Sequence, residues 1–117
     1  MKKINLNLSI IVPVYNEKKT IKKLLLKLNE LKNIKKMIIV VNDASTDGTT
    51  KVLNDNKRYI KHLIHHKKNV GKGGAIKTAK KFVKGNVVII QDGDLEYNPL
   101  DYQKMLSLIS KGYKVVY

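Results

Sequence analysis

The sequence predicts an α/β fold in which a mostly parallel β-sheet carries helices on both of its faces. Short apolar runs rich in valine and isoleucine alternate along the chain with segments of helical periodicity. The runs are apolar at nearly every position, as in strands that are buried on both faces. Because the connections between them are short, these elements are expected to form right-handed βαβ units.

The first helix and the strands have the clearest patterns. Leucine and isoleucine recur at three- and four-residue spacing through residues 18–32, which gives a helix one apolar stripe. Asn16 is expected to cap the N-terminus of this helix. Buried strands are predicted from β-branched runs at residues 8–14, 37–41, 59–64 and 87–91, of which the third is the weakest.

The other elements are predicted from turn and capping residues. The cluster at residues 42–48 predicts a turn before a helix at residues 49–56, with Asp47 or Thr46 as the N-cap. The glycine-rich segment 70–74 opens a helix that is expected to run through about residue 84. A loop at residues 92–99, a helix at residues 100–111 and the start of a fifth strand at residues 113–117 complete the order.

The 117 residues suffice for a single domain, 1–117. Because the chain stops in or just after a strand with no helix to cover it, we expect the domain to be truncated at its C-terminus. The absence of cysteine excludes disulfides, thiolate metal sites and cysteine nucleophiles. No apolar run approaches the ~20 residues of a membrane span, and no apolar segment follows the basic start, so we expect a cytoplasmic location.

The net charge of +15 arises from 24 basic residues against 9 acidic ones. A field of this size suits nucleic acid, an anionic membrane surface or an anionic substrate. Arg58 is the only arginine, so the chain has few side chains that can form bidentate hydrogen bonds with bases. The aromatic residues do not interleave with the lysines as they do in proteins that stack bases. We therefore expect no specific nucleic-acid partner and interpret most of the charge as lysine on solvated faces.

Polar residues follow four of the predicted strands. In an open parallel sheet, ligands bind outside the carboxyl ends of the strands. The sequence places Asp92, Gly93, Asp94 and Glu96 directly after one buried strand. Because residues two apart point to the same side of an extended chain, the carboxylates converge and favour Mg²⁺ or Mn²⁺ completed by phosphates and water. An ordinary Asp-Gly-Asp turn is the alternative.

Gly71 and Lys72 lie in a glycine-rich helix entry. Glycines free backbone N–H groups, a helix N-terminus attracts anions, and Lys72 could neutralise a phosphate. The segment is neither a P-loop nor a dinucleotide fingerprint, since its glycine spacing differs from both. Tight packing of the helix on a strand explains the glycines equally well.

Two further strand ends carry candidate base contacts. Asp43 ends the second strand, where a carboxylate can accept hydrogen bonds from a nucleobase N–H or a ribose hydroxyl. Pro13 restricts the backbone before Tyr15 and is expected to shape a turn in which Tyr15 stacks on a base. Glu17 is equally explained as a first-turn acid that the helix dipole favours.

The three histidines, His62, His65 and His66, have no evident carboxylate partner in the sequence. We therefore expect them to be surface residues and not ligands. The serines lack the context of a nucleophile elbow, so the sequence shows no machinery for acyl transfer.

Taken together and in order, these motifs resemble glycosyltransferase family 2, the inverting nucleotide-sugar transferases of the GT-A fold. Within the family the pattern Asn-x-Gly-Lys-Gly-x-Ala with Asp-x-Asp-Leu-Glu is most similar to the polyprenyl-phosphate (dolichyl-phosphate) mannosyl- and glucosyltransferase branch. The resemblance rests on Ser-Ile-Ile-Val-Pro-Val-Tyr-Asn-Glu at 9–17, Ile-Ile-Val-Val-Asn-Asp-Ala-Ser-Thr-Asp-Gly-Thr at 38–49, His-Lys-Lys-Asn-Val-Gly-Lys-Gly-Gly-Ala at 66–75 and Ile-Ile-Gln-Asp-Gly-Asp-Leu-Glu at 89–96.

The resemblance implies a Rossmann-like GT-A half that binds a nucleotide-sugar donor of the GDP-mannose or UDP-glucose type. It also implies a role for each matching position. Asp92 and Asp94 correspond to the metal-binding pair and Glu96 to a further metal ligand. Nucleotide-sugar contacts correspond to Pro13, Tyr15, Glu17, Asp43, Gly71, Lys72 and Asp92. The family's Asp-Asp-Gly-Ser reads Asn42-Asp43-Ala44-Ser45 here, so the first aspartate is lost and the second retained.

The activity that follows is transfer of a sugar, with inversion, to an acceptor such as a polyprenyl phosphate, in cell wall biogenesis. This acceptor is itself an anion, so a strong general base is not required, and a positive surface would bring the chain to the inner face of an anionic membrane. The family's catalytic base region lies beyond Tyr117 and is left unassigned, as is any oligomer. Two alternatives remain, namely a non-catalytic module that binds nucleotides or polyanions, and a fragment that has no activity alone.

Overall fold

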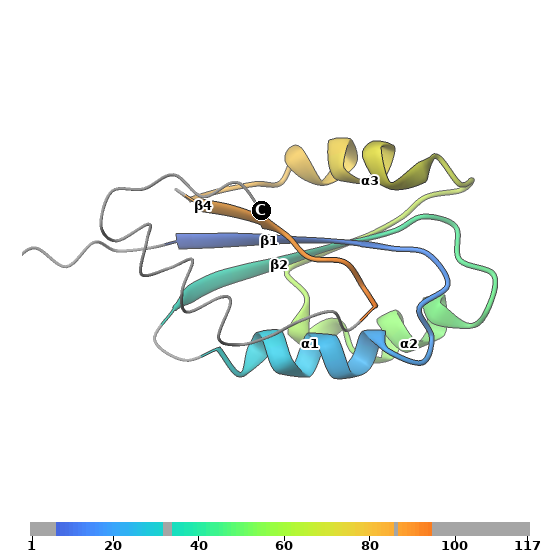
Figure 1. The fold of residues 1–117 in the computed structure, drawn as a ribbon, viewed down its shortest axis with the longest axis horizontal. Coiled ribbons are helices and arrows are strands. Elements are labelled where there is room, and N and C mark those ends of the chain that lie inside the picture. Colours follow the sequence, from blue (N-terminus) through green and yellow to red (C-terminus); the bar gives the residue numbers. More distant parts are fainter. Residues whose placement is uncertain (1–6, 32–33, 86, 95–117) are drawn as a thin grey trace, which may run out of the picture.

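A computed structural model of the chain describes residues 7–31, 34–85 and 87–94. In this part, one all-parallel sheet of order β3-β2-β1-β4 lies between two layers of helix (Figure 1). The predicted α/β class is confirmed, whereas the helix predicted at residues 100–111 and the strand at 113–117 lie outside the described residues. The elements are β1 (Asn7–Val14), α1 (Ile21–Asn29), β2 (Lys35–Asn42), α2 (Thr49–Asp55), the 3-10 turn η1 (Lys57–Tyr59), β3 (His62–His65), α3 (Gly71–Lys80) and β4 (Val87–Ile90).

β1 is the central strand of the sheet. It pairs with β2 along its whole length, from Asn7 opposite Lys35 to Val14 opposite Asn42, and with β4 from Leu8 to Ile11. Every residue of β1 after Asn7 is buried. A strand buried on both faces must be apolar at consecutive positions, which is why this run lacks the alternation of a half-exposed strand.

The larger core lies between the sheet and the layer formed by α1, α2 and η1. The stripe predicted from the sequence faces it: Ile21, Leu24, Leu25 and Leu28 of α1 are completely buried there, together with the side chains of β1 that point to this face. Burying one such side chain contributes roughly 1.5–3 kcal/mol relative to leaving it exposed. This face therefore supplies most of the apolar stabilisation that holds the strands in place.

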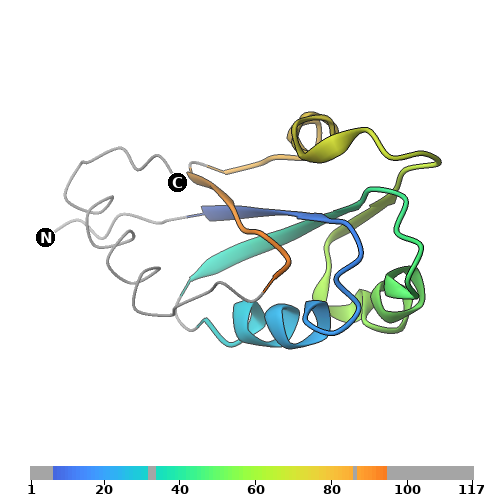
Figure 2. The same cartoon turned by 45° about the vertical axis from the view of Figure 1, so that its right-hand side comes forward.

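Within the described part of the chain, α3 is the one helix that covers the opposite face of the sheet (Figure 2). Ala75 and Ala79 of α3 are completely buried against Ile11, Ile39 and Val41. Because alanine has the smallest apolar side chain, α3 can approach the sheet closely, and its N-terminus lies beside the carboxyl ends of β1 and β2. Two core clusters on opposite faces thus fix the sheet as the middle layer.

Several predicted boundaries were wrong by a few residues, among them the end of α1, which lies at Asn29, and the start of β2, which lies at Lys35. Three of the differences have a turn as their cause. α1 begins at Ile21, because Glu17 O accepts hydrogen bonds from Thr20 N (3.1 Å) and Ile21 N (3.0 Å) in a turn that precedes the helix. α3 ends at Lys80 and β3 begins at His62. In these three cases a turn occupies residues that the sequence pattern assigned to the regular element.

Asn16 does not cap α1, contrary to the sequence-based expectation. Its backbone has a φ of +53°, and its side-chain Oδ1 accepts a hydrogen bond of 2.7 Å from Thr46 N. Asn16 N in turn donates to Ser45 Oγ at 3.0 Å. Asparagine tolerates this left-handed conformation better than most residues. Asn16 therefore joins the loop after β1 to the loop after β2.

The left-handed backbone of Ala44 generates a stability prediction. Its φ of +62° crowds the Cβ atom, a conformation that glycine adopts without this cost. We expect Ala44→Gly to raise the free energy of unfolding by about 1 kcal/mol. Urea denaturation measures this change. Ala79→Gly, at a fully buried position in the last turn of α3, is the control for the sign of the effect and should lower stability. A lower stability for Ala44→Gly would contradict the strain argument.

Candidate functional site

The carboxyl ends of β1, β2 and β4 and the start of α3 surround a pocket of about 190 Å³. Polar loops gather at this edge because every strand of a parallel sheet ends there. The pocket contains most of the site residues predicted from the sequence; Gly71 is not among its lining residues, and Glu96 lies outside the described residues. The lining residues are Pro13, Val14, Tyr15, Glu17, Asp43, Lys72, Ala75, Asp92, Gly93 and Asp94.

Pro13 and Tyr15 form one wall of the pocket. Contrary to the expectation that Pro13 shapes the turn, it lies within β1 opposite Val41. Ile11 O accepts a hydrogen bond from Gln91 N, so the backbone polar groups of Ile11 face β4. Those of Pro13, two residues further on, face the same side of β1. At that point β4 no longer pairs with β1. Proline has no backbone N–H, and at this position the sheet requires none. Tyr15 follows and leaves 48% of its surface exposed, as a flat apolar face beside the pocket.

Glu17 and Thr20 connect the loop after β1 to the loop after β4. The Thr20 hydroxyl lies 2.7 Å from Gly93 O and 3.1 Å from Glu17 Oε2. Glu17 N donates to the Thr49 hydroxyl at 3.0 Å. Glu17 is therefore part of the loop that precedes α1, and not the first-turn acid of that helix, whose first turn contains no acidic residue.

Asp43 is the most constrained residue of the site. Only 3% of its surface is exposed, and three groups donate hydrogen bonds to its carboxylate. His66 Nδ1 (2.9 Å) and Val70 N (2.9 Å) donate to Oδ1, and Gly71 N (2.8 Å) donates to Oδ2. The backbone of Asp43 is also held, since its N–H donates to Val14 O at 2.8 Å. The carboxylate thus joins the end of β2 to the first amides of α3.

The pKa of Asp43 lies below its ordinary value. Burial alone would raise this pKa, because it disfavours the charged form. The hydrogen bonds from His66, Val70 N and Gly71 N, together with the positive charge of a protonated His66, outweigh burial. Asp43 is therefore an ionised carboxylate at neutral pH, able to accept hydrogen bonds and unable to donate one.

Gly71 provides backbone geometry and not a free amide. Its φ of +86° requires glycine, although a Cβ atom would meet nothing within 4 Å. Its N–H and that of Val70 are used by Asp43. This differs from the simple expectation that the first amides of the glycine-rich loop face an anion, because a buried carboxylate of the protein already occupies them.

Lys72 and Asp92 form an ion pair across the pocket. Lys72 Nζ lies 2.6 Å from Asp92 Oδ1, and both side chains are about half exposed. Lys72 comes from the first turn of α3 and Asp92 from the residues after β4. The contact shows that a cation is attracted to Asp92, but a pair this exposed contributes little to stability.

Asp92 and Asp94 flank Gly93 in the turn after β4, where the sequence predicts a divalent metal, and both line the pocket. Gly93 is buried, and a Cβ atom there would lie 3.2 Å from Glu17 Cγ and 3.5 Å from Val14 Cγ2, so the turn packs closely against β1 and its loop. Carboxylates are the oxygen ligands that Mg²⁺ and Mn²⁺ accept, usually one or two with phosphates and water. Within the described residues, no group of three or more histidine, cysteine, aspartate or glutamate side chains could hold a metal. The two aspartates fit a metal that is shared with a phosphate ligand.

The departure at Asn42 lies away from the pocket. Asn42 is 1% exposed, and its Nδ2 lies 2.8 Å from Thr50 Oγ1 and 3.0 Å from His65 Nδ1. His65 Nε2 lies 3.2 Å from Asn54 Oδ1. Thr50 and Asn54 lie in α2 and His65 ends β3, and Asn42 is not among the residues that line the pocket.

Sequence reasoning missed His66. The expectation that all three histidines are surface residues without a carboxylate partner is wrong for this one, which is 15% exposed and paired with Asp43. A signal was present in its position directly after β3, at the same edge as Asp43. The pairing itself depends on how β2, β3 and α3 pack, and no local pattern shows it.

The expected caps of α2 also differ from the structure. Gly48 occupies the N-cap position, with a φ of +99° and no side-chain cap. Asp47, one residue earlier, accepts a hydrogen bond from Thr49 N at 3.0 Å and from Lys18 N at 3.3 Å. Asp47 therefore still satisfies the first amide of α2 and in addition holds the loop after β1.

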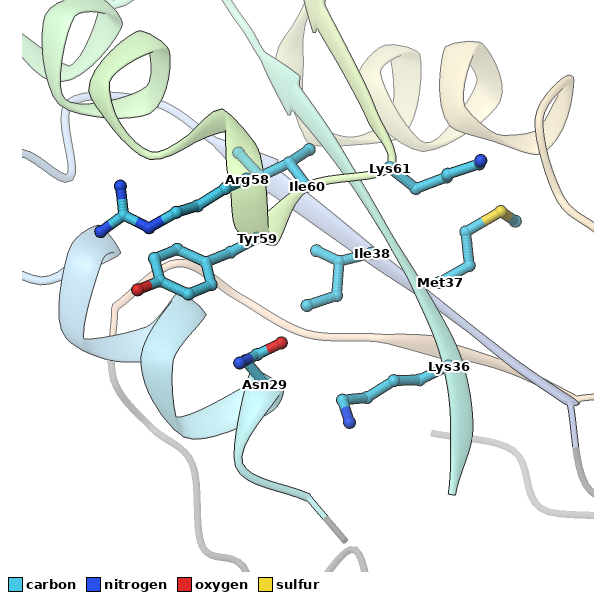
Figure 3. A pocket seen from close by; sticks show the side chains of 8 residues that line it. All are labelled: Asn29, Lys36, Met37, Ile38, Arg58, Tyr59, Ile60 and Lys61. Carbon is cyan, nitrogen blue, oxygen red and sulfur yellow. The ribbon is translucent and has the colours of Figure 1, made fainter. Parts of the chain in front are cut away.

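A larger pocket, of about 420 Å³, lies at the other edge of the sheet (Figure 3). It is formed where β2 begins, beside η1 and the end of α1, and its charged lining residues are Lys36, Arg58 and Lys61. Lys36 Nζ is already bonded to Leu31 O at 2.7 Å, and the Arg58 guanidinium stacks on Tyr59. The size of a pocket does not by itself identify a functional site. The smaller pocket at the carboxyl edge combines carboxylates, a lysine and an aromatic ring, whereas the charged residues of the larger one are all basic.

The hydrogen bonds to Asp43 generate an acid-stability prediction. A carboxylate whose pKa is lowered by folding contributes stability above the pKa of the unfolded chain, and this stability is lost as pH falls through the folded pKa. We expect the free energy of unfolding to fall below about pH 4, and to fall less steeply in Asp43→Asn. Urea denaturation across this range measures both slopes. Asp55→Asn, a surface carboxylate paired with Lys51, is the control, and equal slopes for wild type and Asp43→Asn would contradict the prediction.

The chain is similar to known proteins along almost its whole length. The sequence matches the model of glycosyl transferase family 2 over residues 9–117. Undecaprenyl-phosphate 4-deoxy-4-formamido-L-arabinose transferase from Pectobacterium atrosepticum is 32% identical over 117 residues, which cover 94% of this chain and 36% of that protein. The chain spans between 36% and 44% of the length of three curated relatives that it matches.

Two solved structures resemble this chain. TarS from S. aureus, in complex with UDP-GlcNAc, has a TM-score of 0.75 and 26% identity over 91% of this chain and 32% of that one. The mannosyltransferase PcManGT from Pyrobaculum calidifontis, in complex with GDP-Man and Mn²⁺, has a TM-score of 0.67 and 28% identity over 78% of this chain and 28% of that one.

None of the described helices has the length and apolarity needed to cross a membrane. The four sequence motifs converge on one edge of a parallel sheet, and the family match spans nearly the whole chain. The resemblance inferred from the sequence is thereby confirmed: the chain belongs to glycosyltransferase family 2 and has the Rossmann-like GT-A fold.

Proposed function

We propose that this chain is the donor-binding part of a metal-dependent glycosyltransferase that transfers a sugar, with inversion, from a nucleoside diphosphate to an acceptor. The observation that carries the proposal is the composition of the pocket at the carboxyl edge. An aromatic face, an ionised acceptor, a lysine and a pair of carboxylates line one cavity. This set complements a base, a diphosphate and a divalent cation.

The base end of the donor is assigned to Tyr15 and Asp43. Tyr15 presents an exposed ring on which a base can stack, and base–aromatic stacking is worth about 1–3 kcal/mol. Asp43 accepts hydrogen bonds only, so it suits a base with a ring N–H, as uracil and guanine have. Donors of the UDP-glucose or GDP-mannose type fit this requirement, and TarS and PcManGT have been solved with UDP-GlcNAc and GDP-Man.

The diphosphate is assigned to Lys72 and the start of α3. Lys72 carries a flexible positive charge at the mouth of the pocket, and the partial positive charge of the helix N-terminus adds to it. In the absence of a donor, the same ammonium neutralises Asp92. Lys72 is thus placed to exchange one anion for another when the donor binds.

Asp92 and Asp94 would hold Mg²⁺ or Mn²⁺, with Glu96 proposed as a further ligand. The metal, when bound, supplies Lewis-acid stabilisation of the charge that develops on the leaving diphosphate. Gly93 keeps the two aspartates close to β1, because a larger residue would press on Glu17. A Mn²⁺ ion accompanies GDP-Man in the PcManGT structure.

The acceptor is proposed to be a polyprenyl phosphate, and the place of reaction the cytoplasmic surface of a membrane. The support is the relative named as an undecaprenyl-phosphate sugar transferase. A phosphate oxygen is already an anion, so attack on the anomeric carbon from the face opposite the leaving group does not require a strong base. The net charge of +15 favours approach to an anionic membrane surface.

The metal site can be tested by nucleotide binding. We expect Asp92→Asn and Asp94→Asn each to weaken binding of UDP or GDP in the presence of Mn²⁺ by at least tenfold, since loss of a charged ligand removes several kilocalories of attraction. Isothermal titration calorimetry with and without the metal measures the effect. Asp55→Asn should bind as wild type does. The alternative, a polyanion-binding module, predicts a different result. Nucleotide binding would then not depend on metal, the protein would also bind duplex DNA, and both kinds of binding would be lost at high salt.

Lys72 can be tested in two directions at once. We expect Lys72→Met to weaken nucleoside diphosphate binding by roughly tenfold, because a charged contact to phosphate is lost. The same variant should bind Mn²⁺ alone more tightly than wild type, because the ammonium no longer competes for Asp92. Lys77→Met, on the exposed surface of the same helix, is the matched control. Weaker Mn²⁺ binding by Lys72→Met would contradict the exchange role.

A further inference from the structure

We propose that His66 is a positioning residue that, together with Thr78, orients the carboxylate of Asp43 toward the base of the donor. The inference rests on the proposed function, in which Asp43 meets that base. The inference identifies the residues that determine which oxygen of the Asp43 carboxylate can bind the base and how that oxygen is oriented.

The geometry places His66 between a carboxylate and a hydroxyl. Its Nδ1 lies 2.9 Å from Asp43 Oδ1, and its Nε2 lies 2.9 Å from Thr78 Oγ1. His66 follows β3, Asp43 follows β2, and Thr78 lies in the second half of α3, so three elements meet at one ring. His66 N also donates to Asn42 O at 2.9 Å, which fixes the backbone of the histidine.

The Asp43 carboxylate determines that Nδ1 of the ring carries a proton, and the Thr78 hydroxyl holds the other nitrogen because it can either accept or donate. In the protonated ring both nitrogens donate, and the Thr78 hydroxyl accepts while it donates to Gly74 O at 3.1 Å. In the neutral ring the hydroxyl can donate to Nε2 instead, which leaves the proton on Nδ1. The other neutral form would set the lone pair of Nδ1 against the carboxylate. Asp43 therefore receives an N–H hydrogen bond from Nδ1 in both charge states.

The hydrogen bonds to Asp43 leave one oxygen for a ligand. Among the described residues, Oδ1 receives two hydrogen bonds, from His66 and Val70 N, while Oδ2 receives one, from Gly71 N. A carboxylate oxygen has two lone pairs, so the remaining capacity is on Oδ2. Asp43 lines the pocket despite its burial. His66 thus binds Oδ1 and leaves Oδ2 able to accept a hydrogen bond from a ring N–H of the base.

His66 does not line the pocket, and neither does Thr78. Their loss should therefore affect recognition of the base and leave the contacts to the diphosphate intact. This separates a positioning role from a purely structural one, in which all ligands would be weakened together. Substrate discrimination by a buried acceptor depends on holding it in one orientation, because a carboxylate that can rotate also accepts from water.

The test compares ligands that share the diphosphate and differ in the base. Isothermal titration calorimetry in Mn²⁺ would measure the affinities of UDP, GDP, CDP and inorganic pyrophosphate. Cytosine has an acceptor where uracil has a ring N–H, so wild type should prefer UDP or GDP over CDP. His66→Leu should weaken the preferred nucleotide by roughly tenfold and leave pyrophosphate unchanged.

Three variants sharpen the comparison. His66→Asn should retain the preference, because its amide nitrogen takes the place of Nδ1 and can donate to Asp43. Thr78→Val, which keeps the shape and removes the hydroxyl, should lower the preference about threefold. His65→Leu is the matched control, since His65 lies one residue away but bonds Asn42 and Asn54, outside the pocket, and should leave the preference unchanged.

The outcomes separate this proposal from the proposed function. Equal weakening of pyrophosphate and nucleotides by His66→Leu, or a full preference in Thr78→Val, would overturn the positioning role alone; the second result applies even if His66→Leu does not fold. Binding of pyrophosphate without any base preference in wild type would overturn the base contact and the positioning role, while the metal and diphosphate assignments stand. Absence of all binding would overturn the proposed function as well.

Discussion

The hydrogen bonds of the Asp43 carboxylate are the interaction on which the site depends. A buried carboxylate is costly unless its oxygens are satisfied. Here the donors are two backbone amides at the start of α3 and the imidazole of His66. The same three bonds therefore stabilise the charge, cap the helix and determine where the glycine-rich loop lies. A change at any one of them would be felt by the other two.

The rest of the pocket is built by loops that hold one another. Asn16 bonds the loop after β2, Thr20 bonds the turn after β4, and Asp47 bonds the loop after β1. Such side-chain bonds let short, irregular segments keep a defined shape without burying apolar surface. Lys72 is the exception, because its exposed pair with Asp92 is weak enough to exchange. A frame held by such bonds, with one weakly paired lysine beside Asp92, is what the proposed donor and metal would require.

The two faces of the sheet contribute differently to this frame. The leucine-rich face against α1 provides most of the buried apolar surface, whereas α3 packs through two alanines. Ala75 is both a core residue of the second face and a lining residue of the pocket. The small residue allows the helix N-terminus to approach the strand ends, so the packing of one face directly sets the dimensions of the site.

The sequence by itself determined the α/β class, the order of the elements and the location of the polar groups at the carboxyl edge, because hydrophobic periodicity is local and the edge follows from parallel topology. It also identified Asp43, Lys72, Asp92 and Asp94 as neighbours in one site. Only the tertiary structure showed that His66 holds Asp43, that Asn16 joins two loops instead of capping a helix, and that the amide of Gly71 is occupied. These contacts join residues 23 to 30 positions apart in the chain, so their partners are decided by how three elements pack and leave no local pattern to read.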